Sequence, residues 1–301
     1  MTIAARLLLL AFASLALPAG IAAAQEMAVE TALGEVSVPL DPERVVVFDL
    51  ASLDTLDALG VTVTGVPDAP FPDYLAAYGE IEKAGSLHEP DLEAVNALEP
   101  DLIIVGGRSS PHTQALSQIA PTIDMSVDEA DFVASATQRA MELGRIFDRE
   151  AEAEALVGDL NASIETLREQ AAIVESGLIV MATGSRVSAY GPGSRFGVLH
   201  TDYGVAPARE DLAAAIHGEA VSFEFIAETD PDWLFVVDRD AAIGQGAATA
   251  TLDNELVART RAWTNGHVVY LDPASWYLVG GGLQAMRRNV EQLSQAFTAG
   301  E

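Results

Sequence analysis

The sequence predicts an α/β protein of two Rossmann-like lobes, residues 25–148 and 176–301, joined by a single long backbone helix over residues 149–175. Two observations support this fold class. Short apolar runs alternate with helical stretches on both sides of that helix, which is typical of mainly parallel sheets covered by helices. In addition, one helix–turn–strand motif occurs once in each half of the chain.

The repeated motif runs from Leu92 to Arg108 and again from Phe223 to Arg239. Shifting the second copy back by 131 positions aligns Glu224 with Glu93, Pro231 with Pro100, Asp232 with Asp101 and Arg239 with Arg108. Each copy indicates a short helix that ends before its proline, an apolar strand, and an arginine just past the strand. Ligands of open α/β sheets bind at that end of the strands. The two arginines therefore predict an anion-binding cleft between the lobes, unless both simply face solvent.

The composition narrows the classes of partner. The chain has 301 residues, 50% of them apolar, and a formal net charge of −29 from 45 acidic and 16 basic residues. This excess of acid disfavours binding to nucleic acid or to an anionic membrane surface. There is no Cys, which excludes disulfides, thiolate metal sites and lipid attachment through a cysteine. Every basic residue except Lys83 is Arg, whose planar fork binds the oxygens of anions in pairs.

Residues 1–24 have the pattern of a secretory signal peptide. Arg6 supplies the positive charge, Leu7–Leu17 the apolar core, and Ala22–Ala24 a cleavage site before Gln25. The apolar core is too short for a stable bilayer anchor, and a buried N-terminal helix is the alternative. We therefore expect an exported, non-lipidated protein of the periplasm whose mature chain begins near Gln25.

The first lobe is predicted to open with a hairpin over Met27–Pro39, with Gly34 at its turn. Short apolar runs bounded by turn residues indicate buried strands, and they occur at Arg44–Asp49, Val61–Val66, Leu102–Val105 and Thr122–Met125. Further helices are expected at Leu53–Leu59, which Gly60 ends, and at Tyr74–Ile81 and Thr113–Ile119.

The stretch from Phe132 to about Val174 has neither a proline nor a strand pattern, so it is predicted to be helical with a break near Phe147 and Asp148. Its second part would span roughly 37 Å at the helical rise of about 1.5 Å per residue. A helix of that length would form a rigid strut between the lobes. The alternative is an amphipathic helix packed on one lobe.

The second lobe repeats the alternation of strand and helix. Its predicted strands are Leu178–Thr183, the hairpin partner Arg186–Tyr190, Leu234–Val237 and His267–Asp272. Its predicted helices are Val198–Tyr203, Asp253–Arg259 and Leu283–Phe297. Two loops rich in glycine, Gly191–Gly197 and Gly244–Ala248, interrupt the pattern.

Three loop residues of the second lobe are candidates for contact with a ligand. Arg195 lies in the first glycine-rich loop, which lacks the Gly-Lys-Ser/Thr of a P-loop, so a flexible loop with an exposed arginine is the alternative. His217 precedes the second motif, and Tyr277 lies in a predicted loop after a strand. Loop side chains on a rigid scaffold are common ligand contacts. An imidazole and a phenolate together suit a ferric ion that is held mostly by oxygen atoms.

Five blocks of the second lobe are similar to one known family, and they are Ser188–His200, His217–Ile226, Pro231–Arg239, Leu252–Thr260 and Tyr270–Leu278. Over nearly its whole mature length, the chain resembles the periplasmic substrate-binding proteins of ferric-siderophore ABC transporters. It resembles most closely the branch that binds enterochelin (enterobactin) and other catecholate siderophores. The resemblance implies the class III binding-protein fold with little hinge closure, no intrinsic cofactor, and a monomer.

The resemblance also implies roles for individual residues. Arg108, Arg195 and Arg239 would contact catecholate oxygens, and His217 and Tyr277 would bind the iron when the siderophore supplies only four donors. Glu93 and Glu224 would dock onto arginines of an ABC permease in the inner membrane, with a solvated helix surface as the alternative. The acidity and the single lysine depart from the family, and a salty habitat is one explanation.

Two other functions stay open at this point. The chain could carry another chelate on the same fold, such as haem, cobalamin or a hydroxamate siderophore. It could also be a periplasmic enzyme that acts on a bound chelate, although the sequence contains no G-x-S-x-G, no H-E-x-x-H and no evident pair of nucleophile and base.

Overall fold

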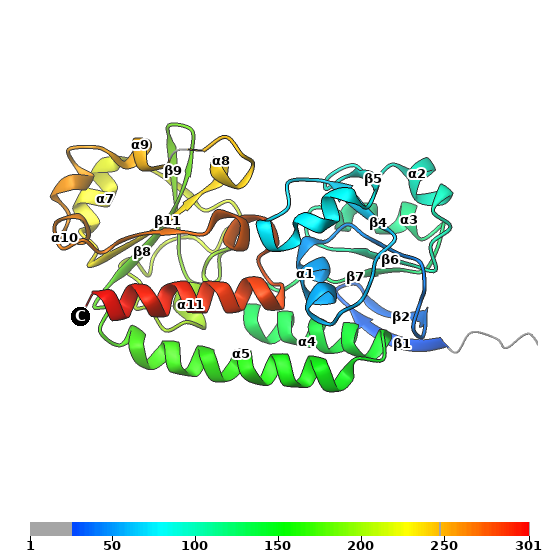
Figure 1. Cartoon of the computed structure of the whole chain (residues 1–301). Helices are drawn as coiled ribbons and strands as arrows, with labels where there is room; N and C mark the ends of the chain where they lie inside the picture. Colours follow the sequence, from blue (N-terminus) through cyan, green and yellow to red (C-terminus); the bar gives the residue numbers. More distant parts are fainter. Residues whose placement is uncertain (1–25, 247, 301) are drawn as a thin grey trace, which may run out of the picture.

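The structure is a computed structural model, and it describes residues 26–246 and 248–300. Two α/β lobes stand side by side over a layer of long helices (Figure 1). The chain passes from the first lobe to the second through α5 (Glu150–Ala171), which confirms the predicted two-lobe fold. The expected signal peptide lies outside the described residues. Among the helices that are described, none combines the length and the hydropathy needed to span a bilayer.

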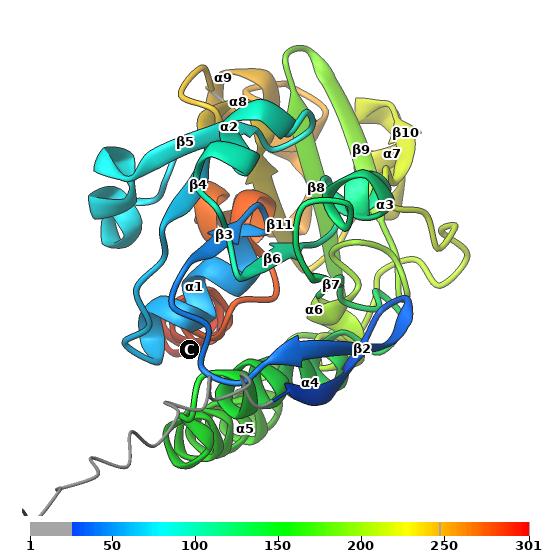
Figure 2. The same ribbon diagram turned by 90° about the vertical axis from the view of Figure 1, so that its right-hand side faces the viewer.

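The first lobe is built on a parallel sheet of order β5-β4-β3-β6-β7. Its strands are β3 (Val45–Val47), β4 (Gly65–Asp68), β5 (Glu82–Ser86), β6 (Leu102–Val105) and β7 (Thr122–Asp124). The helical segments are α1 (Leu50–Ala58), η1 (Asp73–Glu80), α2 (Leu92–Ala97), η2 (Ser110–His112), α3 (Thr113–Leu116) and α4 (Phe132–Ile146). The predicted hairpin is present as β1 (Glu26–Thr31) paired antiparallel with β2 (Gly34–Pro39). Figure 2 shows this hairpin beside α4 and α5, below the sheet.

The second lobe has a mixed sheet of order β10-β9-β8-β11-β12, in which β8, β11 and β12 are parallel and β9 and β10 are antiparallel to their neighbours. Its strands are β8 (Gly177–Thr183), β9 (Arg186–Tyr190), β10 (Glu219–Val221), β11 (Trp233–Asp238) and β12 (Val268–Leu271). Its helical segments are α6 (Val198–Thr201), α7 (Phe223–Thr229), α8 (Arg239–Ala242), α9 (Ala248–Leu252), η3 (Val257–Arg259), α10 (Arg261–Thr264), the π-helical turn η4 (Ala274–Val279) and α11 (Leu283–Ala299).

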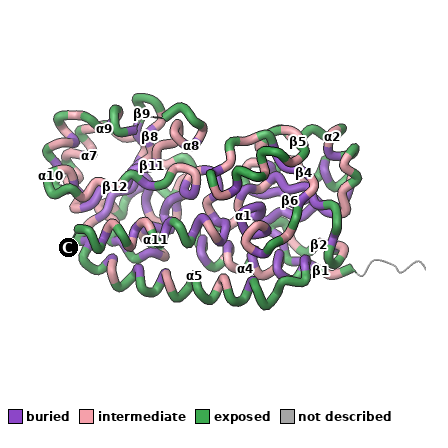
Figure 3. Tube along the Cα trace, viewed as in Figure 1, coloured by how far each residue is buried: buried purple, intermediate pink, exposed green. Residues whose placement is uncertain are grey.

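The helix layer belongs to both hydrophobic cores. Leu160 and Leu167 of α5 pack in the core of the second lobe, whereas Ala153 at the other end packs in the core of the first. Figure 3 shows the outer side of α5 exposed to solvent along its length. Each buried leucine contributes roughly 1.5–3 kcal/mol. The helix is therefore a strut shared by both lobes and not a helix packed on one of them. The predicted break before it is confirmed at Asp148, where φ is 52°.

A buried carboxylate attaches α11 to the first lobe. Asp54 on α1 accepts hydrogen bonds from the backbone amides of Gln284 (2.7 Å) and Ala285 (3.1 Å) and from the hydroxyl of Tyr74 (2.8 Å). A side chain of the first lobe thus satisfies amides that the first turn of a helix leaves without intrahelical partners. Burial raises the pKa of Asp54 to about 7, although these hydrogen bonds favour its charged form. A Cβ on Gly282 would lie 2.4 Å from the Asp54 carboxylate, so this contact requires glycine.

The repeated motif occupies the same place in each sheet, because β6 lies beside the central strand β3 and β11 beside the central strand β8. The likeness extends to the backbone. Asp91 caps α2 and Ser222, at the matching position, caps α7. Before the two prolines, Glu99 and Asp230 both adopt the left-handed conformation, with φ of 47° and 44°. The repeat in the sequence therefore reflects a repeat in the structure.

Several predicted bounds are wrong. The strand expected at Val61–Val66 is β4 at Gly65–Asp68, because the chain turns before it pairs with β3. Of the helix expected at Asp253–Arg259, only the short 3-10 turn η3 (Val257–Arg259) forms, and α9 ends before this range, at Leu252. Tyr277 lies in the π-helical turn η4 and not in an irregular loop. The connecting helix, expected over residues 149–175, spans Glu150–Ala171.

Candidate functional site

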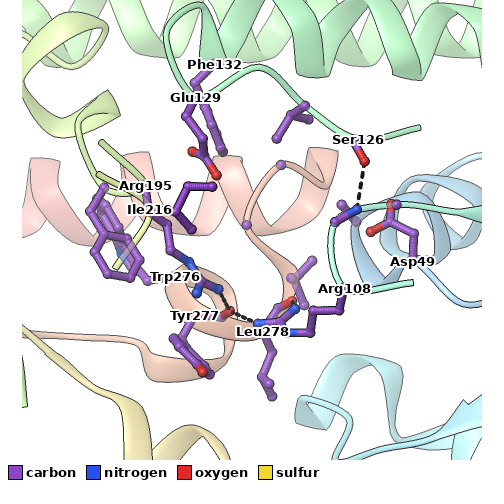
Figure 4. A pocket seen from close by; sticks show the side chains of 18 of the residues that line it. Asp49, Arg108, Ser126, Glu129, Phe132, Arg195, Ile216, Trp276, Tyr277 and Leu278 are labelled. Carbon is purple, nitrogen blue, oxygen red and sulfur yellow. Dashed lines mark hydrogen bonds between the residues drawn. The ribbon is translucent and has the colours of Figure 1, made fainter. Parts of the chain in front are cut away.

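A cavity of about 580 Å³ lies between the lobes and is lined by residues of both. It opens beside the carboxyl ends of the neighbouring strands β3 and β6. After β3 the chain continues to β4, towards one edge of the sheet, and after β6 it continues to β7, towards the other edge. Ligands of open α/β sheets bind at such a point. Four of the five predicted ligand contacts line it, namely Arg108 from the first lobe and Arg195, His217 and Tyr277 from the second. Figure 4 shows the two arginines approaching the backbone of η4 from opposite sides.

Arg108 follows β6 through two glycines. Gly107 has φ of 49° and donates its amide hydrogen to Ser126 Oγ at 2.8 Å, which shapes the turn that carries the arginine. The guanidinium crosses to the other lobe, where Nη2 donates to the carbonyl of Tyr277 at 2.8 Å and Nη1 to that of Leu278 at 3.2 Å. Arg108 is therefore held across the interlobe boundary by backbone oxygens, which are neutral acceptors and form no ion pair with it.

Arg195 binds the same carbonyl from the opposite side. Its Nη2 donates to the Tyr277 carbonyl at 2.7 Å, and its guanidinium lies 4.4 Å from the centre of the Tyr277 ring. Ser194 holds the glycine-rich loop by donating its hydroxyl to the Gly191 carbonyl at 2.6 Å. Burial and the neighbouring charge of Arg195 lower the pKa of the Arg108 guanidinium. Two like charges converge here, and an anion would relieve their repulsion.

The Tyr277 phenol is surrounded by guanidinium groups. Arg239 Nε donates to its hydroxyl at 3.5 Å, the long limit of a hydrogen bond. Burial by itself would raise the pKa of Tyr277, but the hydrogen bond from Arg239 and the charges of Arg195 and Arg108 together lower it. Such an environment favours the phenolate, the form of tyrosine that binds a ferric ion.

Arg239 lies beside this phenol but not among the residues that line the cavity. In the first lobe Gly107 turns the chain after the strand, whereas the matching Asp238 caps α8 by accepting from the amide of Ala241 at 2.9 Å. Arg239 is therefore the first residue of a helix, and its Nη1 also pairs with Asp240 at 3.0 Å. The two arginines of the repeat thus differ in their surroundings.

His217 reaches the cavity from the exposed loop before β10. The adjacent Gly218 has φ of 66°, and a Cβ there would lie 2.7 Å from the ring of Tyr190. Glycine is required at this turn, which fixes where the imidazole enters the site. Within the described part of the chain, no group of three or more His, Asp or Glu residues could hold a metal ion by itself.

Two acidic side chains of the cavity were not predicted, because carboxylates at turns resemble ordinary solvated or capping residues. Asp49, after β3, caps α1 by accepting from the Ser52 amide at 2.9 Å, and burial raises its pKa although Ser52 and Arg108 oppose this. Glu129 lies between β7 and α4, and its carboxylate faces the cavity across from Arg195 (Figure 4).

The two glutamates of the repeat lie away from the cavity lining. Glu93 is in the first turn of α2 and Glu224 in the first turn of α7, and both are exposed. They occupy equivalent positions on the outer surfaces of two equivalent structural units.

Comparison with known proteins identifies the family. A family model described as periplasmic binding protein matches residues 45–275. The petrobactin-binding protein YclQ of Bacillus subtilis is 43% identical over 262 residues, which cover 85% of this chain and 83% of YclQ. The ferric-anguibactin-binding protein FatB of Vibrio anguillarum is 29% identical over 279 residues, which cover 89% of this chain and 87% of FatB.

The chain belongs to the periplasmic binding protein family. Solved structures agree: the crystal structure of YclQ superimposes with a TM-score of 0.88 at 40% identity, covering 91% of this chain and 99% of YclQ. The catecholate-siderophore-binding protein VctP of Vibrio cholerae gives a TM-score of 0.85 at 33% identity, covering 90% and 100%. These similarities confirm the class III periplasmic binding protein fold that the sequence predicted.

Proposed function

We propose that this periplasmic binding protein captures a ferric siderophore, of the catecholate class, between its lobes and delivers it to an ABC permease for iron uptake. The observation that carries the proposal is the convergence of Arg108, Arg195, His217 and Tyr277 on one cavity. Relatives whose names specify petrobactin, ferric anguibactin and catecholate siderophores support this class of cargo.

The chemistry of the cavity suits an anionic iron chelate. Catecholate oxygens carry negative charge, and charge-assisted hydrogen bonds from Arg108 and Arg195 would neutralise it. Where the siderophore supplies four donor atoms, the Tyr277 phenolate and the His217 imidazole would fill the two remaining positions on the iron. Arg239, which does not line the cavity, would act indirectly, because its hydrogen bond stabilises the charged form of the Tyr277 phenol.

The remaining parts of the proposal concern the setting of the protein. Residues 1–24 would direct export, and the mature chain, which has no cysteine to lipidate, would work in the periplasm as a monomer. Glu93 and Glu224 would present matching carboxylates to the permease. Transport and not catalysis is proposed, since the named relatives are binding proteins.

Titration with a ferric bis-catecholate chelate tests the proposal, with the quenching of tryptophan fluorescence as the signal because Trp276 lines the cavity. Arg195→Ala should weaken binding by roughly 1.5–3 kcal/mol, the value of a hydrogen bond to a charged group. The matched control is Arg209→Ala, because Arg209 lies on the surface, paired with Asp211 at 2.7 Å.

The proposal predicts that the Arg209 variant binds the chelate as the wild type does. If the Arg195 variant and the wild type bound the chelate with equal affinity, the cavity would not be the binding site. If the wild-type protein did not bind the chelate, the proposal of a catecholate cargo would be rejected.

A further inference from the structure

The cavity contains one acidic side chain that an anion-binding site does not need. Glu129 lines it together with the arginines. Its Oε2 is buried and forms no hydrogen bond with any residue that the structure describes. The ion pairs found in the described part of the chain also leave Glu129 out, although Arg195 is near enough to stabilise its charge.

The surroundings of Glu129 make this arrangement costly. Val127 and Phe132 line the cavity with it, and a buried polar atom without a hydrogen-bond partner is destabilising because it has lost its contact with water. Burial raises the pKa of Glu129 to about 7, with Asp128 adding to the rise and Arg195 opposing it. A carboxylate in this position would also repel a cargo that carries only negative charge.

The two kinds of charge lie on different sides of the cavity. In Figure 4 the guanidinium groups of Arg195 and Arg108 meet at the backbone of η4, while Glu129 and Phe132 project from the side of the helix layer. A chelate whose anionic iron centre contacts the arginines would therefore direct a different part of its structure towards Glu129. That part of the chelate must carry a hydrogen-bond donor for the Glu129 carboxylate, and a positively charged donor would form the strongest hydrogen bond.

We propose that Glu129 is a specificity-determining residue that binds a protonated amine in the backbone of the siderophore. The inference rests on the proposed function and narrows the cargo to a zwitterionic class, in which an anionic ferric centre is joined to an ammonium-bearing arm. The amine supplies the partner that the buried oxygen lacks and removes its repulsion of the cargo.

Two synthetic ferric bis-catecholate chelates test this, one with a secondary amine in its linker and one with that nitrogen acetylated. The wild type should bind the amine chelate about tenfold more tightly or better, as expected for a charged hydrogen bond. Glu129→Gln should remove this preference, mainly by weakening the binding of the amine chelate. The matched control is Asp128→Asn, which makes the same charge change at a neighbouring exposed residue outside the cavity lining and should keep the preference.

Equal binding of both chelates by the wild type would overturn the role of Glu129. An equal loss for both chelates in the Glu129→Gln variant would overturn it as well, because that result indicates a general defect of the cavity. If the wild type bound neither chelate, the proposed function itself would fail for this class of cargo, and the assignment of Glu129 would fail with it.

Discussion

At the scale of single residues, the site depends on guanidinium groups held by neutral partners. Arg108 and Arg195 share one backbone carbonyl, a neutral acceptor, and neither forms an ion pair within the part of the chain that the structure describes. Their combined field, with the hydrogen bond from Arg239, acts on the phenol of Tyr277. The arrangement prepares one tyrosine for ionisation and leaves a positive region for an anion.

An alkaline titration monitored by tyrosinate absorbance tests this account. The pKa of Tyr277 is lowered, whereas burial raises the pKa of each of the other five tyrosines in the folded protein, to about 12 in the case of Tyr190. The first ionisation on raising the pH should therefore belong to Tyr277. It should disappear in Tyr277→Phe and move to higher pH in Arg239→Ala, which loses a donor to the charged form.

The control for this titration is Tyr270→Phe, at an exposed tyrosine on β12. That variant should keep the first ionisation step unchanged. A first step that survived in the Tyr277 variant would show that the arginines do not control this phenol.

Much of the cavity lining was predictable from the repeat and from the family resemblance, but the acidic residues Asp49 and Glu129 were not. Arg108 was identified because its motif recurs in the chain. Arg195, His217 and Tyr277 were identified because the sequence blocks that contain them resemble those of the ferric-siderophore-binding family. The repetition gave no sign that the surroundings of Arg239 and Arg108 differ, and they do because Asp238 caps a helix where Gly107 makes a turn. Glu129 gave no signal, because an acidic residue in a polar loop looks like solvated surface.

At the scale of elements, the sequence predicted those whose burial is uniform. The central strands β3, β6, β8 and β11 are continuous apolar runs, and all were predicted near their observed places. The edge strands β5 and β10 were missed, because EKAGS and EAV carry little apolar pattern and gain their structure from the strand beside them. The turn η4 was missed because its shape depends on tertiary contacts, such as the Ser275 hydroxyl donating to Asn289 of α11 at 2.6 Å.

The equivalent helices α2 and α7 give the prediction that belongs to this scale. Reversing both charges, Glu93→Lys with Glu224→Lys, should reduce chelate-dependent iron uptake through the permease by about tenfold or more, because like charges across an interface oppose docking. Affinity for the ferric chelate in solution should stay unchanged, since neither residue lines the cavity.

Asp159→Lys, at an exposed position on the outer side of α5, is the matched control and should leave uptake intact. Normal uptake by the double Glu93 and Glu224 variant would reject the docking role of these helices.

At the scale of the whole molecule, the lobes are joined by more than the chain that connects them. Helices α4, α5 and α11 carry residues of both cores, and Asp54 of the first lobe accepts from the amides of Gln284 and Ala285 in the first turn of α11. Moving one lobe against the other would expose apolar surface and break these hydrogen bonds. We therefore expect the cavity to exist before the cargo arrives and the lobes to shift little when it binds.

The central claim is that both lobes supply charge and ligands to one ferric chelate. The most direct measurement is anomalous diffraction at the iron absorption edge from crystals grown with a ferric bis-catecholate. We predict one iron in the interlobe cavity, coordinated by Tyr277 and His217, with catecholate oxygens against Arg108 and Arg195. Iron located outside the cavity, or held there without either side chain, would contradict the account.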